Sequence, residues 1–257
     1  GLGDVYKRQK YMRYNELTFQ GRNAVLEAFR SGKTIDKLFI LDGCQDGPIK
    51  SIVREAKKTD AIINYVDKER LDRLAGTGHH QGVVAIGAAY EYAEVEDILA
   101  AAKEKGEDPF IFILDEIEDP HNLGAIIRTA NLAGAHGVII PKRRAVGLTA
   151  TVAKTSAGAI NYTPVAKVTN ISQTIEELKK QGLWFVCADM GGETMYNLNL
   201  KGPIGLVIGN EGNGVSRLVK DKCDFIASIP MKGDIDSLNA SVAAGVLAYE
   251  IVRQRLN

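Results

Sequence analysis

Three short segments in the second half of the chain combine glycine with polar residues that can do chemistry: residues 122–130 (NLGAIIRTA), 208–214 (IGNEGNG) and 229–241 (IPMKGDIDSLNAS). Each segment begins where an apolar, strand-like run ends. Open α/β sheets bind their ligands beyond the carboxyl ends of their strands. The three segments therefore predict one shared pocket, and a pocket of this kind indicates an enzyme.

Two polar residues of the first segment have competing interpretations. Asn122 precedes an apolar helix, where its side-chain oxygen could accept a free backbone N–H as an N-cap. Arg128 lies six residues later and off the apolar stripe of that helix, as a surface arginine would. Its planar guanidinium is also suited to a phosphate group, which is the functional alternative.

The second segment contains a glycine-rich loop, 209–214, with a carboxylate inside it. Glycines permit close backbone approach to a ligand and positive φ angles. The loop is neither a Walker loop nor a dinucleotide fingerprint, and Glu211 would repel a phosphate. A ligand that is cationic, or that presents hydrogen-bond donors, fits such a loop better.

The third segment places Ser237, Leu238 and Asn239 just before the last predicted helix. Asn239 or Ser241 could serve as the cap of that helix. In the functional alternative, Leu238 offers an apolar wall and backbone groups to a base, while Ser237 and Asn239 orient a substrate hydroxyl.

Two further polar clusters lie outside these segments. His80 and Gln81 belong to a stretch that is either a simple turn or an exposed binding loop before a strand. Lys142, Arg143 and Arg144 follow another predicted strand, on the side of the sheet where the pocket is expected. Such a basic cluster is suited to phosphate contact.

The elements that position these residues alternate between strand and helix. In the second body, short apolar runs typical of strands buried in a parallel sheet predict strands at 110–114, 137–140, 184–188, 204–208 and 225–229. Helical patterns fall at 122–133, 172–180, 215–220 and 241–255.

The first body, residues 14–89, alternates in the same way and predicts a small three-layer α/β domain. Its predicted strands are 17–19, 35–41, 61–66 and 83–88, and its predicted helices are 21–31, 48–58 and 68–74. An acidic stretch, 90–107, is predicted to be a linker followed by a helix. The second domain is expected to cover residues 108–257.

Composition excludes several classes of protein. At 257 residues, with 45% hydrophobic and 25% charged residues, the chain has the make-up of an ordinary globular protein. No apolar run approaches a bilayer span and no signal peptide is visible. The three cysteines and four histidines show no disulfide or metal-ligand spacing. We therefore expect a cytoplasmic protein without a metal site or a membrane partner, and we expect residues 1–9 to be a non-native leader.

The formal net charge of zero hides an uneven distribution. Residues 1–90 and 119–257 each carry a net charge of +4, whereas residues 91–118 carry −8. The two mildly basic bodies could bind a polyanion. They are equally compatible with ordinary surface variation.

The three segments resemble, in order and with comparable spacing, the motifs of the SpoU (TrmH-type) branch of the SPOUT RNA methyltransferases. The stretches GRNAVLEAF (21–29), which contains Arg22 and Asn23, and HQGVVA (80–85) resemble the family's ribosomal-protein-like RNA-binding domain. The two-domain form looks most like the bacterial enzymes that 2′-O-methylate a guanosine of large-subunit (23S) rRNA.

The resemblance implies an α/β fold in which a SPOUT parallel sheet with a C-terminal trefoil knot follows the small N-terminal domain. It also implies S-adenosylmethionine as cofactor and a homodimer whose active site draws on both subunits. By motif, the cofactor-binding residues are Gly209, Asn210, Gly212, Ile229 and Leu238, and the catalytic residues are Asn122, Arg128, Glu211, Ser237 and Asn239. The expected RNA-binding residues are Arg22, Asn23, His80, Gln81, Lys142, Arg143 and Arg144.

The implied chemistry agrees with the residues. A cationic sulfonium tolerates Glu211 nearby, and methyl transfer to a ribose oxygen depends on an in-line approach. The ribose hydroxyl must also lose a proton. A guanidinium is very hard to deprotonate, so we expect Arg128 to clamp a phosphate and stabilise the developing alkoxide, while Glu211 or a water takes the proton.

Three alternatives remain open at this point. The substrate could be a tRNA, methylated at the same ribose position. The chain could be a non-catalytic RNA-binding factor for ribosome assembly on the same fold. It could also be a SPOUT enzyme that methylates a base.

Overall fold

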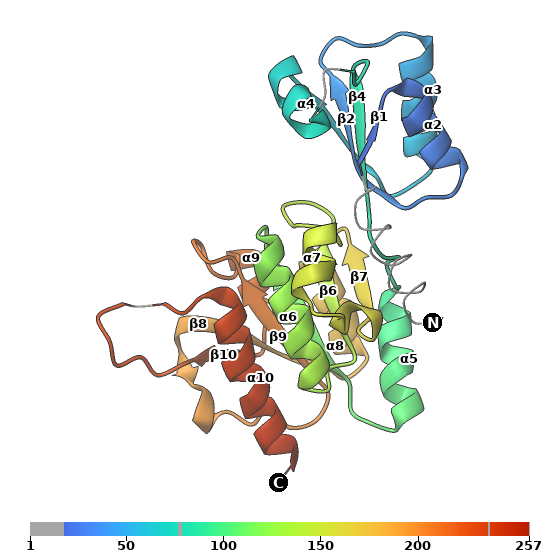
Figure 1. Ribbon diagram of the computed structural model, residues 1–257. Helices are drawn as coiled ribbons and strands as arrows, with labels where there is room; N and C mark the ends of the chain where they lie inside the picture. Colours follow the sequence, from blue (N-terminus) through green and yellow to red (C-terminus); the bar gives the residue numbers. More distant parts are fainter. Residues whose placement is uncertain (1–17, 77–78, 236, 257) are drawn as a thin grey trace, which may run out of the picture. The chain divides into compact units, whose positions relative to one another are not determined.

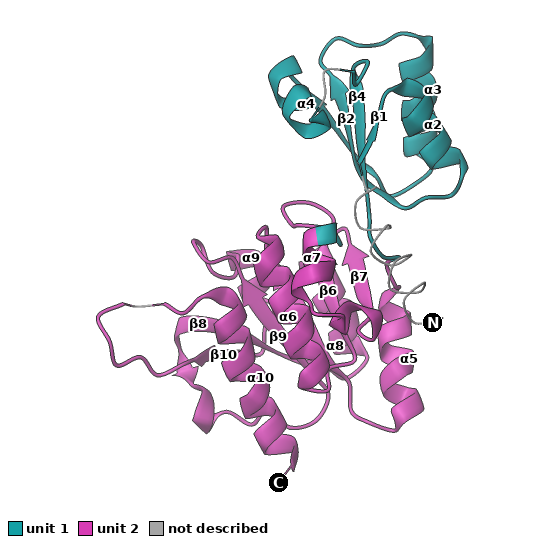
Figure 2. Cartoon of the chain, in the orientation of Figure 1, with its two compact units in different colours: residues 1–91, 147–150 teal, residues 92–146, 151–257 magenta. Residues whose placement is uncertain are grey.

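The computed structural model describes residues 18–76, 79–235 and 237–256. The chain divides into two compact units, Gly1–Glu91 with Gly147–Ala150, and Tyr92–Val146 with Thr151–Asn257 (Figure 2). The expected leader at 1–9 and the predicted strand start at Leu17 lie outside the described residues.

The first unit is a three-layer α/β domain, as the sequence pattern predicted. Its sheet has the order β1-β4-β2-β3, in which β2 and β3 are parallel and β4 is antiparallel to its neighbours. Helices α2 and α3 cover one face and α4 covers the other (Figure 1). The elements are β1 (Thr18–Gln20), α2 (Arg22–Arg30), β2 (Ile35–Leu41), α3 (Gly47–Ala56), β3 (Ile62–Val66), α4 (Lys68–Ala75) and β4 (Val83–Gly87).

The second unit is built on a six-stranded parallel sheet of order β10-β8-β9-β5-β6-β7. Its strands are β5 (Phe110–Asp115), β6 (Gly137–Pro141), β7 (Val165–Val168), β8 (Trp184–Thr194), β9 (Ile204–Gly209) and β10 (Phe225–Ser228). Its helices are α5 (Val95–Lys105), α6 (Pro120–Leu132), α7 (Ala150–Thr155), α8 (Ile171–Lys180), α9 (Arg217–Lys220) and α10 (Ala240–Leu256), with 3-10 turns η1 (Ala159–Asn161) and η2 (Met195–Asn197).

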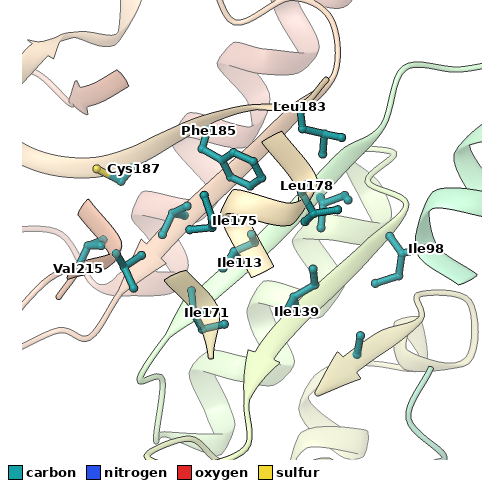
Figure 3. Close-up of a cluster of buried hydrophobic side chains, with 14 residues drawn as sticks. Ile98, Ile113, Ile139, Ile171, Ile175, Leu178, Leu183, Phe185, Cys187 and Val215 are labelled. Carbon is teal, nitrogen blue, oxygen red and sulfur yellow. The ribbon is translucent and has the colours of Figure 1, made fainter. Parts of the chain in front are cut away.

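Both faces of this sheet are covered, which explains why its strands are continuous apolar runs. On one face, Ile113, Ile139 and Phe185 pack together with Ile175 of α8 and Ile98 of α5 (Figure 3). Helices α6 and α10 lie side by side on the other face (Figure 1). The acidic helix α5 thus belongs to the core of the second unit.

Three features of the second unit differ from the sequence-based expectation. Strand β7 was not predicted because its four residues include a lysine and give too short a pattern. Strand β8 was expected to end at residue 188 but continues to Thr194, where it pairs with β10 beyond a register shift. Helix α7 was also missed.

The order of the strands creates a switch point at the centre of the sheet. The chain begins with β5, adds β6 and β7 on one side, and then places β9, β8 and β10 on the other. Ligands of open α/β sheets bind where the strand order reverses in this way.

Among the described residues, no helix combines the length and apolar character needed to cross a bilayer.

Candidate functional site

A cavity of about 390 Å³ lies against the middle of β8 and at the carboxyl ends of β9 and β10. The second and third sequence segments form most of its wall. Its lining includes all five residues predicted to bind a cofactor: Gly209, Asn210, Gly212, Ile229 and Leu238. Glu211 and Ser237, from the predicted catalytic set, line it as well. Two of the three segments thus meet at one cavity, while none of its described lining residues belongs to the first segment, 122–130.

The loop after β9 is closed by its own backbone. Asn210 and Gly214 exchange N–H to carbonyl hydrogen bonds of 3.1 and 2.7 Å. A Cβ on Gly209 would lie 2.1 Å from the Gly214 carbonyl carbon, and Gly214 has a positive φ of 64°. Glycine is therefore required at 209 and 214 by the conformation of the loop itself. At Gly212 a Cβ would fit, since it would lie 3.4 Å from the nearest atom.

One carboxylate joins all three segments. The Oε1 atom of Glu211 accepts a hydrogen bond of 2.7 Å from the side-chain amide of Asn122 and a second one from the amide of Asn239. The Asn239 amide also donates to Oδ1 of Asn122 at 3.1 Å. Each residue comes from a different segment, so the carboxylate is held in place by two amides across the switch point between β5 and β9.

The helix α6 frees Asn122 for this contact. Its N-cap is Asp119, whose carboxylate accepts from the backbone N–H of His121 at 2.8 Å, and Pro120 occupies the first turn. The interpretation of Asn122 as the cap is therefore wrong. Because another residue satisfies the helix start, the buried Asn122 amide can point to Glu211.

Asn239 is the helix cap that one of its two interpretations predicted, and its side chain also contacts the site. Its Oδ1 accepts hydrogen bonds from the backbone N–H groups of Ser241 and Val242 at the start of α10. Its amide nitrogen donates to Glu211 and Asn122. Capping the helix fixes the side chain, and this leaves its two N–H groups aimed at the site.

Arg128 is not brought to the cavity of its own chain. It lies six residues after Asn122 on α6, roughly 9 Å along the axis and about 120° around it. Its side chain is exposed, and the described residues that line the cavity do not include it. The predicted catalytic set therefore separates into a group at the cavity and one arginine apart from it.

A second carboxylate, Asp189 of β8, lines the cavity and was missed by sequence reasoning. Lys220 of α9 forms an ion pair with it, and this hydrogen bond holds the pKa of Asp189 below its ordinary value. The N–H of Gly191 also donates to Asp189 at 3.1 Å. A local signal was present, because Asp189 and the glycines at 191 and 192 directly follow the apolar run at 184–188.

The predicted basic cluster lies at the carboxyl end of β6. Arg144 forms an ion pair of 3.1 Å with Glu116, while 76% of its side chain remains exposed. Arg143 and Arg144 border a separate shallow depression of about 220 Å³. The cluster is close to the cavity in the fold, because the backbone carbonyl of Glu116 accepts a hydrogen bond of 3.1 Å from the side-chain amide of Asn210, a cavity residue.

In the first unit, the two motifs meet through hydrogen bonds. Gln81 accepts hydrogen bonds from the backbone N–H and the guanidinium of Arg22 at 3.1 and 3.2 Å, and Arg22 also pairs with Asp46. Of the two interpretations of His80, a turn or an exposed binding loop, the exposed one is wrong, because its side chain is buried with Nε2 2.8 Å from Asp72. Asn23 is exposed.

Comparison with known families finds two matches along the chain. Residues 109–249 match the SpoU rRNA Methylase family, and residues 20–93 match the family described as RNA 2′-O ribose methyltransferase substrate binding. The two matched ranges correspond to the second and first units.

Individual relatives are similar over nearly the whole length. The chain is 53% identical over 236 residues to YacO of Bacillus subtilis, which is assigned to the TrmH family of tRNA/rRNA methyltransferases; this covers 91% of the chain and 94% of YacO. A Staphylococcus haemolyticus protein with the same family assignment is 49% identical over 241 residues, covering 93% and 96%.

Solved structures agree. The SpoU methyltransferase AviRb from Streptomyces viridochromogenes, in complex with the cofactor AdoMet, has a TM-score of 0.58 and 26% identity, covering 93% of this chain and 90% of AviRb. A TrmH/SpoU tRNA modifying enzyme of A. aeolicus has a TM-score of 0.53 and 29% identity, covering 58% and 77%.

Proposed function

The chain belongs to the SpoU (TrmH) family of RNA methylases, and from this premise we propose that it transfers the methyl group of S-adenosylmethionine to a ribose 2′-hydroxyl of large-subunit (23S) rRNA. The proposed target is a guanosine. A tRNA substrate is the alternative within the same chemistry.

The cavity supports S-adenosylmethionine as the cofactor. Its volume lies in the range of small-molecule pockets. Ile208, Ile229 and Leu238 provide an apolar wall for an adenine ring. The charged residues among its described lining are Asp189 and Glu211, and two carboxylates suit a ligand that carries a sulfonium and an ammonium group.

The observation that carries the proposal is the position of Glu211. Its carboxylate lies at the cavity wall and is oriented by the amides of Asn122 and Asn239. A fixed carboxylate beside a cofactor pocket is what a proton-abstracting group requires. This arrangement supports an enzyme over a non-catalytic RNA-binding factor, which would need no such orientation.

Glu211 is therefore our candidate base, acting directly or through a water. The bound cofactor supplies an electrophilic methyl group with a neutral thioether as the leaving group. Glu211 would accept the proton of the ribose hydroxyl as the ribose oxygen takes up the methyl group that the cofactor would supply. Asn122 and Asn239 keep the carboxylate in the orientation that this step needs.

Arg128 and the quaternary structure form a second part of the proposal. Since Arg128 is exposed and away from the cavity of its own chain, we propose that it acts in the site of a second copy within a homodimer. There it would clamp a substrate phosphate and stabilise the alkoxide. A C-terminal trefoil knot, expected from the family, belongs to the same proposal.

For the RNA, the match of residues 20–93 to a ribose methyltransferase substrate-binding family supports the first unit as a substrate-binding domain. We propose that Asn23 and Gln81 contact RNA directly, with Arg22 and His80 shaping their loop. Near the cavity, the basic cluster of Lys142, Arg143 and Arg144 would contact phosphates of the target strand.

The decisive experiment is methylation in vitro with labelled S-adenosylmethionine, offering 23S rRNA and bulk tRNA separately and mapping the modified nucleotide. We expect label on the ribose of one guanosine of rRNA. Label on tRNA alone would favour the alternative substrate, and label on a base would refute ribose chemistry. RNA binding without transfer to any RNA would indicate a non-catalytic factor.

A further inference from the structure

The first unit carries a second polar surface that the two sequence motifs do not include. A cavity of about 410 Å³ opens on its surface between α3 and the edge strand β3. Three cations and one aromatic ring contribute to its lining: Lys50, Arg54, Lys57 and Tyr65. We call these four residues the α3 patch.

Lys50 and Arg54 lie on α3, and Lys57, its C-cap residue, continues the same face in helical conformation. They are spaced at i, i+4 and i+7, which places side chains in a row along a helix. The opposite face carries Ile49, Ile52 and Ala56, which are buried in the domain core. The row extends over about 10 Å of helix, which is long enough to follow a nucleic-acid backbone past more than one phosphate.

The positive charge of this face is not neutralised within the chain. Among the described residues, Lys50 and Lys57 have no ion-pair partner, and Arg54 is 3.9 Å from Glu55 with 71% of its side chain exposed. The Glu55 carboxylate is already bound by Lys58 at 2.9 Å, and this hydrogen bond holds the pKa of Glu55 below its ordinary value.

Tyr65 adds a flat aromatic surface to the cations. It lies on β3 and is 56% exposed. It follows Ile63 by two residues, so its ring projects on the same side of the sheet as α3. An exposed tyrosine beside a row of cations is a suitable platform for stacking an unpaired base while the neighbouring phosphates meet the cations.

We propose that the α3 patch binds a single-stranded segment of the RNA substrate, with one base stacked on Tyr65 and successive phosphates held by Lys50, Arg54 and Lys57. The proposal rests on RNA as the substrate and adds a binding site distinct from the Asn23 and Gln81 loop. Charge complementarity and the aromatic platform together favour RNA over an acidic protein, which would need no stacking surface.

The test uses the full-length protein and two probes, a 12-nucleotide single-stranded oligoribonucleotide and a 23S rRNA fragment. The triple variant Lys50→Gln, Arg54→Gln, Lys57→Gln should weaken binding of both at least tenfold and reduce the slope of log K against log salt by about 2. Tyr65→Ala should weaken binding roughly fivefold or more, whereas Tyr65→Phe should retain it.

The matched control removes three exposed cations from α4, on the other face of the same sheet: Lys68→Gln, Arg70→Gln, Arg73→Gln. This variant should bind RNA as the wild type does. If the α3 patch variants keep wild-type affinity and salt slope while the wild type methylates RNA, the patch is wrong and the proposed function stands.

The opposite result is also informative. RNA binding that is lost in the patch variants, in a wild-type protein that transfers no methyl group, would support the patch and refute the catalytic proposal. A patch that captures poly-L-glutamate, with RNA affinity unaffected by its substitutions, would point to an acidic protein partner and overturn the RNA assignment.

Discussion

Glu211 shows how much a single side chain depends on residues far away in the sequence. Its partners Asn122 and Asn239 lie 89 and 28 residues away. The start of a helix positions each partner. Asp119 caps α6, so the Asn122 side chain is not needed as the cap, and Asn239 caps α10. The orientation of the carboxylate is therefore a product of two capping arrangements.

At this scale we predict that Glu211→Gln lowers kcat by roughly 10²- to 10⁴-fold, the usual contribution of a positioned base. Glutamine keeps an oxygen that can accept from Asn122 and Asn239 but loses the basic carboxylate. Steady-state methyl transfer and calorimetric titration with S-adenosylmethionine measure the two effects separately, and cofactor affinity should change less than tenfold. Glu96→Gln, on the exposed side of α5, is the control. A kcat within threefold of wild type would refute Glu211 as base.

At the scale of elements, the loop after β9 depends on its glycines for different reasons. Gly209 has no room for a Cβ because the backbone of Gly214 faces it, and Gly214 requires a positive φ. Gly212 meets neither restriction. A glycine-rich pattern therefore does not by itself reveal which glycine approaches a ligand.

We predict that Gly209→Ala opens this loop, while Gly212→Ala leaves it intact. The first change forces a Cβ to 2.1 Å from backbone atoms and should destabilise the fold by about 3 kcal/mol and weaken cofactor binding. The second should alter stability by no more than about 0.5 kcal/mol. Urea unfolding and cofactor titration compare the pair, and equal effects of both substitutions would contradict this account.

A buried histidine at the start of β6 predicts that the stability of the second unit depends on pH. His136 is buried; its Nδ1 accepts from the N–H of Phe110 at 3.0 Å and its Nε2 lies 3.0 Å from Glu107. Burial lowers the pKa of His136 below its ordinary value of 6.5, although the hydrogen bond with Glu107 opposes this shift. The neutral ring therefore links the starts of β5 and β6.

Because the folded pKa is the lower one, the unfolded chain binds the proton more readily. The stabilisation is complete above about pH 6.5 and should be lost as the pH falls towards and through the folded pKa. Denaturant unfolding at pH 7.5, 6.5 and 5.5 measures it. His136→Gln should flatten the dependence, and the exposed His121→Gln should leave it unchanged. An unaltered slope in His136→Gln would show that another group is responsible.

At the scale of the whole molecule, one chain presents a cavity with an oriented carboxylate and an arginine that does not reach it. Closed two-fold assemblies place the same patch of each copy against the other. A homodimer of this type could bring Arg128 of one copy to Glu211 of the other. This arrangement would make activity a property of the pair.

Mixed dimers test this arrangement. We predict that Arg128→Ala and Glu211→Gln homodimers are both inactive, whereas a purified heterodimer of the two variants recovers about half of the wild-type activity. One of its two sites would then contain both intact residues. Differently tagged copies, co-expressed and purified in two affinity steps, provide the sample. An inactive heterodimer would mean that Arg128 does not complement Glu211 across the dimer.

Much of the secondary structure was predictable because it depends on local patterns. All four strands of the first unit and five of the six strands of the second were indicated by short apolar runs. The features that the local pattern did not predict, β7 and the end of β8, depend on pairing with another strand. Strand β7 exists because β6 offers an edge, and the end of β8 is set by its pairing with β10.

The sequence by itself determined the alternation of strands and helices, the three chemistry-bearing segments and the family, because each is encoded in residues that are close along the chain. Only the tertiary structure decided that Asp119 caps α6, that Asp189 lines the cavity, that His80 is buried and that Arg128 lies apart. The physical reason is that burial, capping and charge pairing depend on which side chains and backbone groups lie next to one another in space. These groups are often many residues apart in the sequence, and the order of the strands in the sheet decides which of them become neighbours.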